Sequence, residues 1–186
     1  MSTKSNVYLA QFSLTITPGN MIFMPYAVSC VWSYAQTHDD IRDNYEMKEV
    51  FFEKIHPDEV VNSLVDPKVF AFGCYIWNCN YSDTVAKKVK EKFPDCLIIY
   101  GGPQIPITAH DPWWDEHPYV DVVIYYEGEK RFTRVLQCSS KEEMSLIPNV
   151  SVNFDGDWTF NLDTKAVGKD RIRDLEKIPS PYLLGM

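Results

Sequence analysis

Residues 97–104 constrain the fold of this 186-residue chain more than any other stretch. Four apolar residues, LIIY, are followed at once by Gly101, Gly102 and Pro103. A short apolar run that stops at glycines and a proline is typical of a buried strand in a parallel sheet. Because glycine lets the backbone approach another group closely, we expect the loop after this strand to lie against something bulky.

Strand-like and helix-like segments alternate along the chain. Apolar runs predict five strands, at residues 7–12, 46–52, 68–75, 97–100 and 120–125. Apolar residues at spacings of three and four predict helices at residues 23–34, 57–65, 82–93 and after residue 129. This alternation is typical of α/β proteins, so we predict a doubly wound, Rossmann-like or flavodoxin-like, five-stranded parallel sheet with helices on both faces.

A different pattern follows this alternation. Residues 150–154 and 158–162 alternate between apolar and polar side chains on either side of Asp155 and Gly156, which predicts a β-hairpin. Residues 170–186 have little periodicity and are typical of a linker that leaves a domain. We therefore predict a Rossmann-like domain at residues 1–148, a hairpin appendage at 149–169 and a linker at 170–186.

Charge and composition argue against several classes of protein. The net charge is −8 and the lysines and arginines are interspersed with more numerous acidic residues, which argues against a nucleic acid or an anionic membrane as partner. The chain starts without the apolar segment of a signal peptide and contains no apolar run long enough to cross a bilayer. We therefore expect a cytoplasmic protein that binds neither nucleic acid nor membrane. Five cysteines at irregular spacing favour free thiols over disulfides or metal ligands.

Ligands of open parallel sheets bind beyond the carboxyl ends of the strands. In this chain those positions are residues 11–14, 74–78, 101–104 and 126–129. They contain no phosphate-binding loop, no dinucleotide-binding glycine motif, no paired nucleophile and base, and no acceptor aspartate of a phospho-receiver. Glycine, amide, hydroxyl and aromatic groups remain. They favour a large, mostly neutral ligand held by backbone hydrogen bonds and flat apolar contacts.

Three motifs, in this order, resemble the N-terminal domain of cobalamin-dependent radical S-adenosylmethionine enzymes. They are Gly101-Gly102-Pro103, the segment VDVV leading to Glu127-Gly128-Glu129, and the tail DLEKIPSPY that ends at Tyr182. Residues 18–34 also resemble the first loop and helix of that family. The resemblance implies that cobalamin lies on the carboxyl edge of the sheet. Its dimethylbenzimidazole tail would enter a channel beside the fourth strand, where Gly101 and Gly102 leave room for it.

The resemblance also implies which residues contact the cofactor. Amides and hydroxyls are the expected partners of the corrin side chains, and glycines are expected beside the tail. The expected cofactor-binding residues are Gln11, Phe12, Ser13, Leu14, Gly73, Cys74, Tyr75, Ile76, Trp77, Asn78, Gly101, Gly102, Pro103, Gln104, Tyr126, Glu127 and Gly128. We expect no catalytic residue and no metal ligand in this chain.

Three absences and differences qualify the resemblance. The cobalamin domains similar to methionine synthase supply a histidine to cobalt through Asp-x-His-x-x-Gly, which this chain lacks. We therefore expect base-off cobalamin without a histidine ligand, resting on Leu14, Tyr75, Ile76 or Trp77. Tyr126 stands where the radical enzymes more often have glycine. The cysteines lack the Cys-x-x-x-Cys-x-x-Cys spacing of a four-iron cluster, so this chain cannot generate the radical alone.

Simpler structural interpretations apply to several conspicuous side chains. We interpret Trp113 and Trp114 as ordinary packing residues, because large aromatic side chains are more often buried than bound to ligands. His110 and His117 stand among acidic residues, but their spacing matches no metal motif, so we expect a solvated loop.

Three functional hypotheses follow from the sequence. In the leading one, the chain is the methylcobalamin-binding domain of a radical S-adenosylmethionine methyltransferase. It would then need a radical domain, in cis or in trans, to bring S-adenosylmethionine and the iron–sulfur cluster. In the second, the chain is a free-standing cobalamin carrier or sensor. In the third, it is a doubly wound interaction module without a cofactor. Whether the chain is itself an enzyme is left open.

Overall fold

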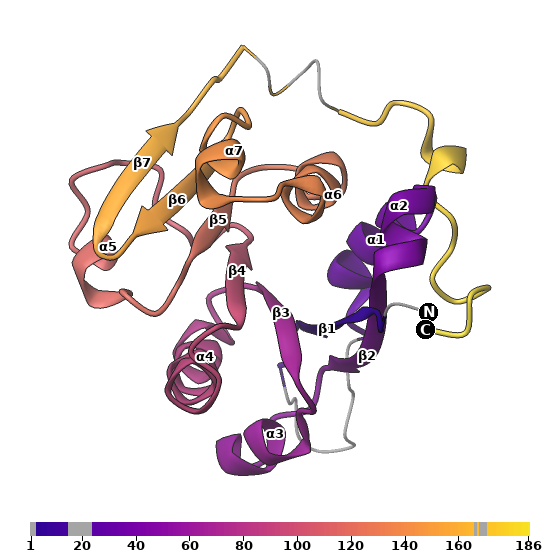
Figure 1. Cartoon of the computed structure of the whole chain (residues 1–186), viewed down its shortest axis with the longest axis horizontal. Coiled ribbons are helices and arrows are strands. Elements are labelled where there is room, and N and C mark those ends of the chain that lie inside the picture. Colours follow the sequence, from indigo (N-terminus) through magenta and orange to yellow (C-terminus); the bar gives the residue numbers. More distant parts are fainter. Residues whose placement is uncertain (1–2, 15–23, 166, 168–170) are drawn as a thin grey trace.

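The computed structural model describes residues 3–14, 24–165, 167 and 171–186. Within these residues one sheet of seven strands runs through the molecule, in the order β2-β1-β3-β4-β5-β6-β7 (Figure 1). The strands are β1 (Ser5–Ala10), β2 (Tyr45–Phe51), β3 (Pro67–Gly73), β4 (Leu97–Gly101), β5 (Val122–Ile124), β6 (Val150–Phe154) and β7 (Asp157–Asn161). The predicted α/β class is confirmed. The predicted count of five strands is wrong, because two further strands join the same sheet.

Strands β1 to β5 form the parallel part of the sheet. Their spatial order, 2-1-3-4-5, is that of flavodoxin-like doubly wound sheets. In the register of the middle strands, Leu9 lies beside Ala71 and Ala71 lies beside Ile99. The carboxyl ends of β1 and β3 therefore lie next to each other at the point where the strand order reverses. Ligands of such sheets bind at this point.

Helices cover both faces of the sheet (Figure 1). They are α1 (Tyr26–Ala35), α2 (Asp39–Asn44), α3 (Pro57–Ser63), α4 (Cys79–Lys92), α5 (Trp113–Glu116), α6 (Glu129–Gln137), α7 (Lys141–Ser145) and the 3₁₀ helix η1 (Leu175–Lys177). The core beneath α1, α2, α6 and α7 is separate from the core beneath α3, α4 and α5. Successive strand residues point to opposite faces, so Phe70 and Phe72 belong to the second core and Ala71 to the first.

The helix boundaries agree only partly with the sequence pattern. The short helices α2, α5 and α7 are not predicted, because four to six residues are too few to display a helical period. Helix α4 begins three residues before the predicted cap Ser82, which is buried inside the helix. The predicted loop at residues 18–20 and the predicted helix start at Phe23 lie outside the described residues.

Strands β6 and β7 extend the main sheet. They pair antiparallel on either side of Asp155 and Gly156, and β6 also pairs antiparallel with β5. Both turn residues have positive φ values, 53° and 106°, as a tight hairpin turn with primed geometry requires. The two strands therefore cover the edge of β5 and are continuous with the main sheet.

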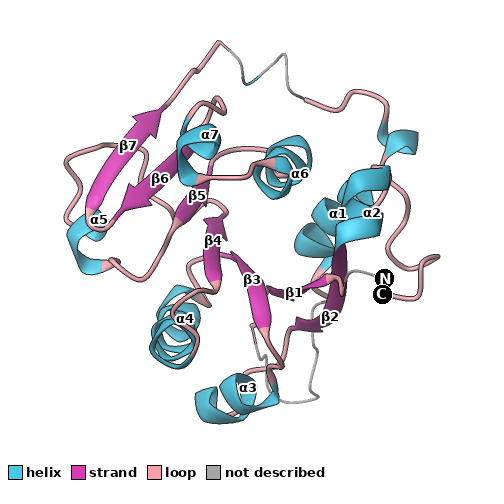
Figure 2. Cartoon of the chain, viewed as in Figure 1, coloured by secondary structure: helices cyan, strands magenta, loops and turns pink. Residues whose placement is uncertain are grey.

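The segment from residue 171 to the C-terminus runs past α1 as a loop interrupted by η1 (Figure 2). The ring of Tyr182 stacks on that of Tyr26 with 5.8 Å between centroids. The hydroxyl of Ser33, inside α1, lies 3.6 Å from the Sδ atom of Met186. Residues 171–186 thus pack against the same helix that covers one face of the sheet. No described helix is both long enough and apolar enough to cross a membrane.

The amino ends of β4 and β5 are joined by a charged network. Asp121, whose side chain is 9% exposed, accepts hydrogen bonds from the backbone N–H of Ile98 (2.8 Å), from Lys90 Nζ (2.7 Å) and from Lys141 Nζ (2.9 Å). Asn153, at the end of β6, donates its backbone N–H to the Asp121 carbonyl (2.8 Å). These bonds hold three neighbouring strands in register at the edge opposite the switch point.

Candidate functional site

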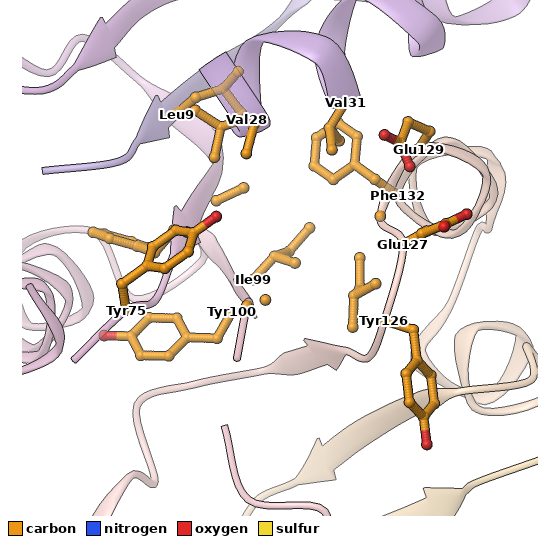
Figure 3. A pocket seen from close by; sticks show the side chains of 18 residues that line it. Leu9, Val28, Val31, Tyr75, Ile99, Tyr100, Tyr126, Glu127, Glu129 and Phe132 are labelled. Carbon is orange, nitrogen blue, oxygen red and sulfur yellow. The ribbon is translucent and has the colours of Figure 1, made fainter. Parts of the chain in front are cut away.

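A groove opens at the carboxyl edge of the sheet, between helices α1 and α6. Its volume is about 250 Å³ and its floor is formed by the ends of β1, β3, β4 and β5 (Figure 3). The lining residues are Leu9, Ala27, Val28, Val31, Ala71, Phe72, Gly73, Tyr75, Ile99, Tyr100, Gly101, Gly102, Ile124, Tyr126, Glu127, Gly128, Glu129 and Phe132. The groove therefore runs beside β4, where the family resemblance implies a channel for a cofactor tail.

The floor of the groove is apolar because of the strand periodicity. Leu9, Ala71 and Ile99 lie side by side on three neighbouring strands and point to the face that α1 and α6 cover. On β5, Val122 is the partner of Ile99, and Ile124 lies two residues further along on the same face, opposite Gly101. A flat apolar surface of this kind accommodates an aromatic ring by contact and gives it no hydrogen-bond partner.

Three glycines allow the elements around the groove to pack closely. A Cβ atom at Gly101 would meet only the Ile124 carbonyl oxygen, at 3.4 Å, within 4 Å. A Cβ atom at Gly73 would come within 3.1 Å of Val28, and one at Gly128 within 3.0 Å of Val31. Helix α1 can therefore pack close to the sheet and to the start of α6 only because these positions lack side chains.

Gly102 has a different role from Gly101. It adopts a φ of 116°, and a Cβ atom there would overlap the carbonyl oxygen of Cys74. A methyl group at position 102 would therefore collide with the backbone of Cys74. The loop itself requires glycine at this position, since its backbone packs directly on the end of β3.

Tyr126 at the mouth of the groove adopts a left-handed conformation with a φ of 62°. Bulky residues are rarely found in this region, which costs L-residues about 1–2 kcal/mol. Its ring points away from the groove in Figure 3. Beside it, Glu127 Oε1 pairs with Arg171 Nε at 3.1 Å.

Two of the predicted amide ligands are engaged by the protein itself. Asn78 is 1% exposed; its Oδ1 accepts from the Tyr75 N–H (2.8 Å), and its Nδ2 donates to the carbonyls of Phe12 (3.1 Å) and Gly73 (3.0 Å). Gln11 Oε1 accepts from the N–H groups at the start of α1 at 3.1 and 3.3 Å. Both side chains thus hold the ends of β1 and β3 against their neighbours.

An exposed apolar rim surrounds the strand ends. Leu14 after β1 is 41% exposed, and Ile76 and Trp77 after β3 are 76% and 40% exposed. Tyr75 stacks on Trp77 with 4.7 Å between ring centroids and 11° between ring planes. Tyr126, which is 46% exposed, lies after β5 on the same edge. Such a collection of exposed flat and branched apolar groups is typical of a ligand-binding surface.

The remaining predicted site residues lie at the same edge but outside the groove lining. Phe12 is buried and packs edge-on against Tyr81, with 4.5 Å between centroids, and Ser13 is also buried. Pro103 and Gln104 are exposed in the turn after β4. Cys74 is fully buried, and burial raises the pKa of its thiol well above the usual value. Its position suits a small core residue at a crowded strand end.

Sequence reasoning did not assign several lining residues to the site. The helical residues Ala27, Val28 and Val31 of α1 and Phe132 of α6 contribute to the two walls of the groove. Their apolar spacing predicts helix faces that pack on a sheet, and periodicity alone does not distinguish a packed position from one that borders an opening.

The aromatic cluster of α5 lies on the opposite face of the sheet. Trp113 stacks on His117 at 4.0 Å, and Trp114 is buried, so the expected packing role of both tryptophans is confirmed. His117 is 8% exposed and its Nε2 lies 3.4 Å from Asp83 Oδ2; the expectation of a solvated loop is therefore wrong for this residue. Among the described residues no group of three or more histidine, cysteine or carboxylate side chains could hold a metal ion.

Two curated proteins are similar to most of this chain. One is the cobalamin-dependent radical SAM methyltransferase TokK of Streptomyces tokunonensis, 33% identical over 169 residues. The other is a 2-(S-pantetheinyl)-carbapenam-3-carboxylate methyltransferase of Streptantibioticus cattleyicolor, 32% identical over 169 residues. Each match covers 88% of this chain and 24% of the relative, so the chain spans about a quarter of the length of these proteins. No protein-family model matches the chain.

Proposed function

Since the chain is homologous over most of its length to cobalamin-dependent radical S-adenosylmethionine methyltransferases, we propose that it is a cobalamin-binding domain. The observation that carries the proposal is the apolar groove beside β4, at the switch point where doubly wound sheets bind their ligands. At roughly 30 Å³ per water, its volume equals about eight water molecules, which is enough for one bicyclic aromatic base.

The two parts of the ligand would occupy different parts of the edge. The nucleotide tail would enter the groove between α1 and α6, along Gly101. The corrin ring would lie over the rim, on Leu14, Tyr75, Ile76 or Trp77. Backbone groups and the remaining expected residues at the strand ends would meet the corrin side chains. The rim is apolar and aromatic, which suits a flat macrocycle.

We further propose that cobalamin binds base-off and without a histidine ligand from this chain. None of the four histidines, all of which are described, lines the groove. A tail buried in the groove would hold its base away from the cobalt, and the surface under the ring would then be apolar. When bound as methylcobalamin, the cofactor would supply a methyl group for transfer. The chain's own residues would bind it, orient it and exclude water beneath it.

The reaction itself would need a second domain. The five cysteines of this chain do not have the spacing that holds a four-iron cluster, so S-adenosylmethionine and the cluster would be held by a radical domain in cis or in trans. The names of both relatives, which are methyltransferases, support methyl transfer as the reaction. A stand-alone carrier or sensor would use the same groove. Sequencing the native gene beyond the codon of Met186 distinguishes these two hypotheses. A stretch that encodes Cys-x-x-x-Cys-x-x-Cys there favours the enzyme.

Cobalamin retention tests the proposal directly. The purified chain is mixed with hydroxocobalamin in the dark, excess is removed by gel filtration, and the visible spectrum of the protein fraction is recorded. We expect cobalamin to co-elute at up to one equivalent with a base-off spectrum. If no cobalamin co-elutes, the chain does not bind it and the proposal fails. A base-on spectrum of retained cobalamin would leave binding intact but contradict the placement of the tail.

A further inference from the structure

The depth of the groove contains almost no hydrogen-bonding group for a ligand. The residues of the floor are Leu9, Ala71, Ile99 and Ile124. They lie in the sheet, where neighbouring strands pair the backbone groups. The walls nearest to them are Val28, Val31 and Phe132, from α1 and α6. A polar group buried there loses its water and finds no replacement partner.

Polar side chains lie at the mouth of the groove instead. The Tyr75 hydroxyl points into the opening, and the carboxylates of Glu127 and Glu129 lie at the rim beside α6 (Figure 3). Tyr100 also lines the groove, but its ring belongs to the core on the opposite face of the sheet, where its hydroxyl donates to Asp83 Oδ1 at 3.0 Å. The groove therefore has a polar entrance, which suits ribose hydroxyls, and an apolar interior, which suits a base without polar substituents.

We propose that this groove selects among cobamides by the polarity of their lower base, an inference that rests on the proposed function. Dimethylbenzimidazole fills the interior with two methyl groups and a fused ring, which gain from burial against Ala71, Ile99 and Ile124. Adenine, the lower base of some other cobamides, carries an amino group and additional ring nitrogens in the same space. These polar atoms lose their hydration without gaining partners, so the adenine form binds more weakly.

A panel of three corrinoids tests this inference. Dissociation constants are measured by absorbance titration for cobalamin, for adeninylcobamide and for cobinamide, which lacks the nucleotide. We expect adeninylcobamide to bind about tenfold or more weakly than cobalamin, because each unpaired buried group typically costs about fivefold or more in affinity and adenine buries more than one. We expect cobinamide to bind more weakly than cobalamin as well, since it leaves the groove empty.

The outcomes of the panel separate the two proposals. Equal affinity for cobalamin and adeninylcobamide overturns the selectivity and leaves the cobalamin-binding function standing. Cobinamide binding as tightly as cobalamin shows that the tail does not use the groove, which also overturns the selectivity. Failure of all three to bind overturns the proposed function itself.

A matched pair of variants locates the selectivity in the groove. Ala71→Ser adds one hydroxyl to the floor, and Ala86→Ser adds the same hydroxyl to the core beneath α4, on the other face of the sheet. We expect Ala71→Ser to narrow the cobalamin-to-adeninylcobamide ratio at least threefold or so, because a hydrogen-bond partner then becomes available to the purine. Ala86→Ser leaves the ratio unchanged. An unchanged ratio in folded Ala71→Ser, checked by its circular dichroism spectrum, overturns the placement of the base on this floor.

Discussion

The two edges of the parallel sheet differ in polarity and in how completely their groups are paired. At the amino edge, Asp121 receives a backbone N–H and two lysines, and each of its oxygens has a partner. At the carboxyl edge, the chain exposes apolar side chains, leaves an open groove and holds Tyr126 in a left-handed conformation. A buried polar network in which every group has a partner makes the surrounding structure rigid. Strained backbone and exposed apolar side chains are typical of binding sites. The contrast supports the proposal that the amino edge stabilises the fold and that the carboxyl edge binds the cofactor.

Removing the charge at the amino edge has the largest expected effect on stability. Asp121→Ala leaves Lys90, Lys141 and the Ile98 N–H without their common acceptor. We expect the free energy of unfolding to fall by about 3 kcal/mol, near the lower end for a broken buried pair because both lysines are partly exposed. Urea denaturation followed by circular dichroism measures this loss.

The matched control is Asp95→Ala, which removes an exposed carboxylate from the same edge. We expect it to change the unfolding free energy by less than about 0.5 kcal/mol. The dissociation constant for cobalamin of folded Asp121→Ala is expected to stay within a factor of two of the parent. If the dissociation constant of the folded variant rises by more than this factor, the amino edge also contributes to cobalamin binding.

Two neighbouring glycines of the carboxyl edge, Gly101 and Gly102, are expected to differ in role, one in cobalamin binding and the other in stability. Gly102→Ala forces a Cβ atom onto the Cys74 backbone at a positive φ, so we expect a loss of about 2 kcal/mol of stability. Gly101→Ala meets only one carbonyl oxygen, at 3.4 Å. We expect it to cost less than about 1 kcal/mol of stability and to weaken cobalamin binding roughly tenfold, because the methyl group enters the groove.

Thermal denaturation and absorbance titration on the same two variants provide the comparison. Equal effects on stability would contradict the distinction between the two glycines. Undiminished cobalamin affinity in Gly101→Ala would place the tail elsewhere on the edge.

The smallest expected effect concerns the strained turn. Tyr126→Gly and Tyr126→Ala remove the same ring, but only glycine relieves the left-handed conformation. We expect the glycine variant to be about 1 kcal/mol more stable than the alanine variant. The difference in melting temperature between the two variants measures this. A more stable alanine variant would mean that the turn relaxes and that its φ of 62° is not imposed by the fold.

Much of the fold follows from the sequence for a physical reason. Strand runs and helix periods report which face of each element is buried, so the order of the long elements and the α/β class are predictable. Residues 97–104 indicate a strand that ends against a close neighbour, and the structure identifies that neighbour as Cys74. Short helices such as α5 and the joining of β6 to β5 are not predictable, because they depend on contacts between distant segments.

For the candidate site, too, local properties follow from the sequence, whereas contacts between distant segments do not. The sequence alone determined where the strand ends lie, that glycines cluster there and that the histidine motif of related cobalamin domains is absent, since these are local properties of the chain. Only the tertiary structure shows that Gly101 borders the groove while Gly102 packs on the backbone of Cys74. It also shows that Asn78 and Gln11 already have hydrogen-bond partners within the chain, and that α1 and α6 form the walls of the groove. A groove is the space left between elements, and the packing of distant residues determines its position and its polarity.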